Sequence, residues 1–170
     1  VIGHLIQALG NWLELLYWRA WKGRPTDWPL TRTRDIFGAG TLSDVSRLYH
    51  KGEGKSTIST ADPDLAEWRR SITYAVSLIN AEKQQDRMQT FNSLYGMFRG
   101  MVTSFLLILI LYMTLTRQWN PAVLAVLIAA GVLSVFSMHK FSRLFAAELF
   151  AIVRRLLKSK PQADSATEKE

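Results

Sequence analysis

The chain has 170 residues, no cysteine and a formal net charge of +7, from 21 Lys and Arg against 14 Asp and Glu. The absence of cysteine excludes disulfides, thiolate zinc sites and cysteine nucleophiles within this sequence. In a soluble protein this basic excess would suggest a nucleic-acid partner. Much of the charge flanks two apolar segments, however, which favours anionic lipid headgroups as the partner instead. Because the chain begins at Val1, with neither an initiator Met nor a charged leader, we expect it to be a fragment.

Residues 1–21 predict a helix with one narrow polar stripe. The stripe recurs at spacings of three and four, which places its members on one face: His4, Gln7, Asn11 and Glu14. Aromatic residues fill the second half of the helix and basic residues follow, which is typical of a helix leaving a bilayer on the cytoplasmic side. We favour the end of a transmembrane span, in which the stripe faces a bundle interior or a wet cavity. The alternative is a helix lying flat at the interface, with the stripe as its solvated face.

Residues 22–92 predict a cytoplasmic helical region with loops. Pro25, Pro29 and several glycines break any helix before residue 41. A short helix is expected over Thr41–His50, with Thr41 or Ser43 able to cap it. A second helix is expected to begin with Asp62 as its N-cap and Pro63 as its first residue. No further proline occurs before Pro121, so this helix is expected to continue toward the membrane.

Two uncharged apolar runs, Met101–Thr116 and Pro121–Met138, predict a transmembrane hairpin over residues 93–138. A spanning helix needs about 20 apolar residues at about 1.5 Å each, and these runs approach that length. The alternative is a hairpin buried in a soluble core. The link Arg117–Asn120 carries one positive charge, whereas both outer flanks are rich in Lys and Arg. The charge distribution therefore predicts that both long arms are cytoplasmic.

Small and basic residues around the hairpin suggest packing and lipid contacts. The small residues permit close helix approach, either within the hairpin or between copies: Gly96, Gly100, Ala125, Ala129 and Gly131. The basic residues are expected to reach lipid headgroups: Arg99, Lys140, Arg143, Arg154 and Arg155. Residues 139–158 predict an amphipathic helix along the inner leaflet, unless its apolar face packs on protein such as the Leu65–Ile79 face. Residues 159–170 have the composition of a disordered tail.

The sequence predicts no catalytic, cofactor or metal site. Gly54-Lys55-Ser56 matches the end of a phosphate-binding loop, but Tyr49 stands where that motif requires glycine. His4, His50 and His139 lack metal-ligand spacing. We therefore expect a protein that is not an enzyme.

The opening Ile2-Gly3-His4-Leu5-Ile6-Gln7, a polar middle and a late hairpin resemble an uncharacterised class of bacterial inner-membrane proteins. In that class a Gly-His pair near the end of an early span precedes a cytoplasmic insert and two closing spans; the resemblance implies no activity. The expected fold is an all-α integral membrane protein of the inner membrane. The expected function is a membrane anchor or oligomeric scaffold whose cytoplasmic helices bind a partner. The alternative is a small channel, transporter subunit or membrane-permeabilising effector that uses the polar stripe.

Overall fold

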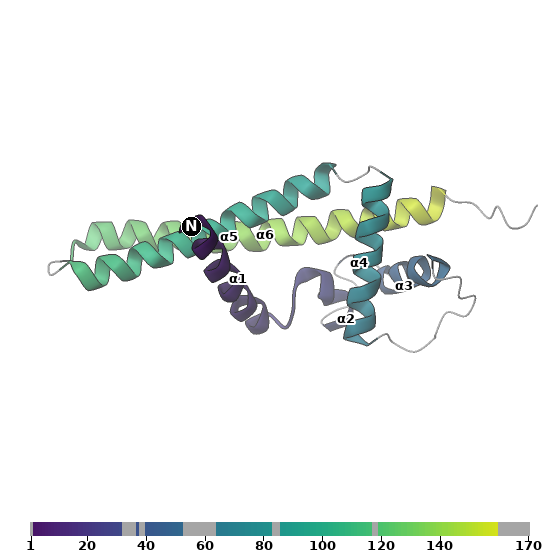
Figure 1. Cartoon of the computed structure of the whole chain (residues 1–170), viewed down its shortest axis with the longest axis horizontal. Coiled ribbons are helices and arrows are strands. Elements are labelled where there is room, and N and C mark those ends of the chain that lie inside the picture. The colour runs from purple at the N-terminus through teal and green to yellow at the C-terminus, as the bar shows by residue number, and fades with distance from the viewer. Residues whose placement is uncertain are drawn as a thin grey trace, which may run out of the picture. The chain divides into compact units, whose positions relative to one another are not determined.

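The computed structural model describes residues 2–31, 37, 40–52, 64–82, 86–116 and 119–159, and every element among them is helical (Figure 1). The elements are α1 (Ile2–Ala20), the 3-10 helix η1 (Pro25–Asp27), α2 (Trp28–Thr31), α3 (Thr41–Gly52), α4 (Leu65–Ala81), α5 (Asp86–Leu115) and α6 (Pro121–Ser159). The all-α prediction is therefore confirmed. The chain forms two compact units: unit 1 is Val1–Arg24 with Gln89–Phe145, and unit 2 is Pro25–Met88 with Ala146–Glu170.

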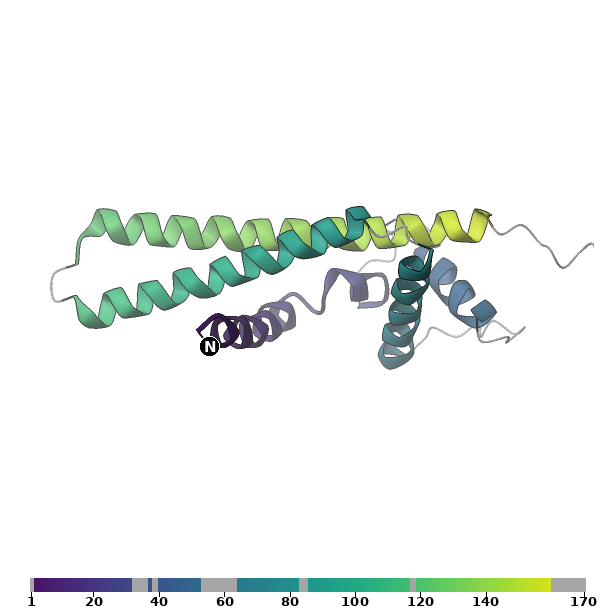
Figure 2. The same cartoon turned by 45° about the horizontal axis from the view of Figure 1, so that its top comes forward.

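The hairpin of unit 1 is formed by α5 and α6, which run side by side in both views (Figures 1 and 2). Pro121 is the first residue of α6, where a missing N–H has no cost. The rings of Phe98 and Phe141 stack with centroids 5.4 Å apart. In the described part of the chain, α5 and α6 are the two helices long and apolar enough to cross a membrane.

Helix α6 continues through the boundary that the sequence suggested between residues 138 and 139. Its first part, up to Phe145, belongs to unit 1, and the part from Ala146 belongs to unit 2. No proline or glycine lies between Gly131 and Ser159, so nothing in the sequence requires a break there. The amphipathic segment is thus the second half of one 39-residue helix and not a separate element.

The expected course of α4 was wrong at both ends. The N-cap is Asp64, whose carboxylate accepts a hydrogen bond of 2.7 Å from the backbone N–H of Leu65. This start is two residues later than expected, and Asp62 and Pro63 lie outside the described residues. At its other end α4 stops at Ala81 with Glu82 as the C-cap, and α5 begins anew at Asp86. The prediction of one helix continuing toward the membrane therefore fails.

Unit 2 contains an apolar core built from η1, α2, α3, α4 and the last part of α6. Trp68 of α4 is fully buried, its indole N–H donates to the carbonyl of Thr26 at 2.9 Å, and its ring lies 6.4 Å from that of Phe150. On α6, Leu149, Ile152 and Leu156 are also buried. These three residues belong to the face that the sequence placed on lipid. They pack instead on protein, which is the alternative that the sequence left open.

The two units expose different side chains. All of the large apolar side chains that are exposed in the described part of the chain lie in unit 1, chiefly on α1, α5 and α6. Most of the buried apolar side chains lie in unit 2; Trp18 and Met138 are the two that unit 1 contributes. Unit 1 also buries the polar residues Glu14, Thr103 and Ser134. Unit 2 therefore has the pattern of a water-soluble domain, and unit 1 has the reverse.

Candidate functional site

The strongest candidate site in unit 1 is an ionic cluster around Glu14, on the face of α1 that packs against α5. Glu14 is 6% exposed. Nη1 of Arg99, from α5, donates to its Oε2 at 2.6 Å, and Nη2 of Arg24 lies 3.0 Å from its Oε1. We name Glu14, Arg24 and Arg99 the Glu14 cluster. Both carboxylate oxygens are thus engaged, as a buried charge requires.

The chain reverses direction after α1, and this reversal places Arg24 next to Glu14. Lys22 has a left-handed backbone with φ 58°, and Gly23 follows with φ 110°. The N–H of Gly23 donates to the carbonyl of Trp18 at 2.8 Å, and the N–H of Lys22 donates to that of Arg19 at 3.3 Å. These two bonds form the Schellman motif that terminates many helices. Because the motif reverses the chain, Arg24 reaches back along the helix that it follows.

An aromatic layer surrounds the cluster and joins α1 to both helices of the hairpin. The indole N–H of Trp18 donates to the hydroxyl of Tyr95 on α5 at 3.0 Å. The hydroxyl of Tyr17 and Nδ1 of His139 on α6 are hydrogen-bonded at 3.0 Å. The ring of Trp21 lies 4.7 Å from that of His139. These contacts fix the position of α1 on the hairpin at the level of the Glu14 cluster.

A close backbone approach brings α1 and α5 together beside the cluster. A Cβ atom at Gly10 would lie 3.1 Å from Oγ1 of Thr103 and 3.6 Å from Cγ of Arg99. Thr103 is almost fully buried, and its hydroxyl donates to the carbonyl of Arg99. A side chain at Gly10 would therefore require Thr103 to shift by a few tenths of an ångström, and glycine permits this close packing of the helices without such a shift.

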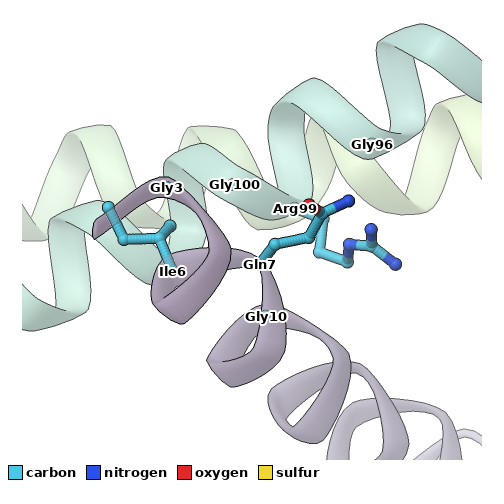
Figure 3. Close-up of a pocket in the computed structure, with 7 residues that line it drawn as sticks. All are labelled: Gly3, Ile6, Gln7, Gly10, Gly96, Arg99 and Gly100. Atoms are coloured by element: carbon cyan, nitrogen blue, oxygen red, sulfur yellow. The ribbon is translucent and has the colours of Figure 1, made fainter. Parts of the chain in front are cut away.

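A pocket of about 270 Å³ opens next to this approach (Figure 3). It is lined by Gly3, Ile6, Gln7, Gly10, Gly96, Arg99 and Gly100. Gln7 and Arg99 are the two lining residues with polar side chains, and Figure 3 shows these side chains next to each other where α1 crosses α5. A Cβ atom at Gly3, Gly96 or Gly100 would meet nothing within 4 Å. A side chain at any of these three positions would therefore extend into open space.

The charges around the pocket are not balanced within the cluster. One carboxylate, Glu14, is shared by two guanidinium groups, Arg24 and Arg99. The Arg99 side chain is 21% exposed, and Glu14 is the one acidic group that it contacts in the described part of the chain. The cluster therefore carries a local charge of about +1, and part of it faces the pocket.

The structure brings together part of the predicted polar stripe. Glu14 is buried in the cluster and Gln7 lines the pocket, whereas His4 and Asn11 are exposed away from both. Of the predicted packing residues, Gly131 lies next to Phe105 of α5, where an added Cβ atom would be 3.9 Å from the Cβ of Phe105, and Gly96 and Gly100 line the pocket. Ala125 and Ala129 are exposed on α6.

The predicted headgroup residues divide into two groups. Arg99 and Arg154 bind protein: Arg99 pairs with Glu14, and Arg154 donates to Asp44, Thr41 and the carbonyl of Phe37. Lys140, Arg143 and Arg155 are exposed. For these three residues, contact with lipid stays a prediction.

Sequence reasoning missed several residues of the site. These residues are Gly10, Arg24, Tyr95 and Thr103, none of which the sequence pattern marks as a site residue. A usable signal was present: Gly3, Gly10 and Glu14 recur at spacings of seven and four, on one face of α1.

The site offers ion pairing, hydrogen bonding and a cationic pocket wall. In the described part of the chain no group of three His, Asp or Glu side chains is placed to hold a metal ion. No protein-family model, curated protein or solved structure matches the sequence. The function proposed below therefore rests on the molecule itself.

Proposed function

We propose that the chain is a membrane anchor: α5 and α6 form a transmembrane hairpin, and unit 2 is a cytoplasmic helical module that binds a protein partner. The observation that carries the proposal is the outward position of the apolar side chains in unit 1. In the apolar stretches of α5 and α6, only 6% and 11% of the residues are buried. A hairpin at the core of a soluble protein would be mostly buried, so an apolar solvent explains this surface better.

The flanking charges support the orientation. Lys140, Arg143 and Arg155 follow the second apolar run, and Trp119 and Asn120 lie at its opposite end. Basic residues stay on the cytoplasmic side of a membrane, and tryptophan favours the membrane–water interface. These preferences favour cytoplasmic ends for both arms and an outer position for the link.

The Glu14 cluster favours an anchor over a channel or transporter. An ion-conducting or proton-carrying carboxylate needs access to water or to an exchangeable partner. Glu14 instead has each oxygen bound by a guanidinium group, which holds α1 to α5. Ion or proton flux measured in liposomes containing the purified chain distinguishes the two functions: the anchor predicts none above that of empty liposomes.

The topology is tested by reporters on the intact chain in cells. A reporter fused after Glu170 is expected to be cytoplasmic, and an epitope placed within Arg117–Asn120 is expected to be accessible only from outside. The chain is also expected to remain in the membrane pellet at alkaline pH. Cytoplasmic labelling of the link, or release of the chain at alkaline pH, would overturn the proposal.

Association of copies is a second part of the proposal, and the exposed face of α6 supports it. Ala125 and Ala129 are small and exposed one turn apart, a spacing that permits close helix approach. Since the chain has no native cysteine, Ala129→Cys is expected to form a disulfide-linked dimer in membranes. The matched variant Met113→Cys, on the exposed surface of α5, is the control. Equal cross-linking of the two variants would exclude a specific α6–α6 interface.

A further inference from the structure

We infer that the pocket between α1 and α5 binds the phosphate group of an anionic phospholipid, through the Arg99 guanidinium and the Gln7 amide. This inference rests on the proposed membrane function, and it assigns a ligand to a site that the anchor by itself does not need. Three properties of the pocket carry it: its donors, its charge and its depth along α5.

The pocket wall presents hydrogen-bond donors and no acidic side chain. Arg99 uses Nη1 for Glu14, and its Cζ lies 5.9 Å from the centroid of the Tyr95 ring; in the described residues its other N–H groups have no hydrogen-bond acceptor. A guanidinium has five N–H donors in a planar fork, which suits a phosphate oxygen pair. The Gln7 side chain is exposed at the same wall, and its amide supplies further N–H donors (Figure 3). Both groups can therefore donate to one anion.

The local charge selects an anion. Because Glu14 is shared between Arg24 and Arg99, one positive charge remains without a carboxylate in the cluster. Arg24 is 56% exposed and can be hydrated, whereas Arg99 is 21% exposed and lines the pocket, so an anion in the pocket would offset the part of the charge that Arg99 carries. A lipid phosphate carries that negative charge and is abundant at the membrane surface.

The position of Arg99 along α5 is close to the level at which lipid phosphates lie in a membrane. Arg99 lies roughly 24 Å along the helix from Leu115, the last residue of α5, at about 1.5 Å per residue. The hydrocarbon layer is about 30 Å thick, so Arg99 lies near the layer's boundary and can extend toward the phosphates. Trp18 and Tyr95 meet at the same level, as aromatic residues do at such a boundary.

The four glycines explain why the pocket is open to a lipid. Gly3, Gly96 and Gly100 leave space that a side chain would occupy, and Gly10 permits the close approach of α1 to α5. The glycerol carbons next to a phosphate can therefore lie against backbone. The same glycines provide substitutions that fill the pocket and leave the Glu14 cluster intact.

The test uses the full chain purified in detergent and native mass spectrometry with phosphatidylglycerol or phosphatidylcholine added. The wild-type chain is expected to retain at least fivefold more phosphatidylglycerol. Gly100→Leu fills the pocket and is expected to remove this preference. The control Thr114→Leu introduces the same side chain at an exposed position of α5, 14 residues beyond Gly100 and outside the pocket, and is expected to keep it.

A charge series at Gln7 keeps the test independent of folding. Gln7 is exposed, so its replacement does not disturb the core. Retention of phosphatidylglycerol is expected to rise for Gln7→Lys and to fall for Gln7→Glu, each by about threefold or more. Changes of opposite sign for two substitutions of similar size indicate an electrostatic contact and not a packing defect.

Two further measurements distinguish a lipid ligand from a soluble phosphate ester, and the pocket assignment from the membrane anchor. Full displacement of the lipid by glycerol phosphate would support the site and assign it to a soluble phosphate ester; no displacement would support a lipid. Equal retention of both lipids, or equal phosphatidylglycerol retention in all variants, would overturn the pocket assignment. Alkaline extraction of the wild-type chain from membranes tests insertion separately. If the chain resists extraction but shows no lipid preference, only the pocket assignment is refuted. If the chain is released, the anchor is refuted.

Discussion

Trp68 and Trp12 are the same residue type on two helices of one chain, yet Trp68 is 0% exposed and Trp12 is 59% exposed. Trp68 lies in unit 2 among other apolar side chains, as expected for a domain folded in water. Trp12 lies on α1 of unit 1, whose buried residues include the polar Glu14 and Thr103. The proposed membrane location accounts for unit 1, because in apolar surroundings the exposure of apolar side chains has no hydrophobic cost. A single sequence thus contains two opposite patterns of burial.

The largest expected effect comes from placing charge on the outward face of the hairpin. Ile128 and Val132 are exposed on α6. Replacing both by arginine is expected to disfavour membrane insertion by roughly 5–7 kcal/mol, at about 2.5–3.5 kcal/mol per arginine near the bilayer centre. The measurement is the fraction of chain that resists alkaline extraction. The control pair, Thr73→Arg with Ser77→Arg on the exposed face of α4, is expected to leave that fraction unchanged; equal loss for both pairs would remove the distinction between the units.

The next largest effect is expected in the core of unit 2. Trp68→Ala removes a fully buried ring and the hydrogen bond to Thr26, so unit 2 should lose about 3–5 kcal/mol of stability. Hydrogen exchange of the α4 amides measures this loss. Trp12→Ala, which removes the same side chain from an exposed position, is expected to leave α4 exchange unaltered. Unchanged α4 exchange in Trp68→Ala would show that this tryptophan does not organise the core.

The Glu14 cluster should give an intermediate effect. Glu14→Leu leaves Arg24 and Arg99 without their carboxylate, and loss of one partner of a buried pair costs about 3 kcal/mol at the lower end of the known range. Because Arg24 is 56% exposed, most of this cost is expected to come from Arg99. Exchange of the α1 amides should then accelerate by about two orders of magnitude. Glu67→Leu, in the first turn of α4, serves as control; similar α1 exchange in both variants would reduce the cluster to a surface ion pair.

The smallest expected effect compares two glycines in unit 1. A Cβ atom at Gly10 would lie 3.1 Å from Oγ1 of buried Thr103, so Gly10→Ala is expected to cost about 2–3 kcal/mol of packing, which the gain of about 1 kcal/mol in helix propensity reduces to a net loss of about 1–2 kcal/mol. A Cβ atom at Gly96 meets open space, so Gly96→Ala is expected to stabilise α5 by up to about 1 kcal/mol through helix propensity. Thermal unfolding midpoints of the two variants in one detergent should move in opposite directions. A shift of the same sign would contradict the packing at Gly10.

The hairpin, the α3 helix and the apolar face of α4 could be predicted because each is determined by a local pattern of side chains. The end of α4 at Ala81 could not, since no glycine or proline marks it. The destination of Leu149, Ile152 and Leu156 was ambiguous for a physical reason: an apolar helix face is equally compatible with lipid and with a protein core. The pairing of Glu14 with Arg99 joins residues 85 positions apart, so no local pattern reports it. The predicted tail over residues 159–170 lies outside the described residues except for Ser159, the last residue of α6.

The central claim is that the exposed apolar surface of unit 1 faces lipid and that unit 2 faces water. Because the chain has no native cysteine, single cysteines report this directly. The three variants are Ile110→Cys, Val132→Cys and Thr73→Cys. These residues are exposed on α5, α6 and α4, respectively. In opened membrane fragments treated with a polar maleimide, we predict rapid labelling at residue 73, and labelling at 110 and 132 only after denaturation in detergent. Labelling at 110 and 132 as fast as at 73 would contradict the account.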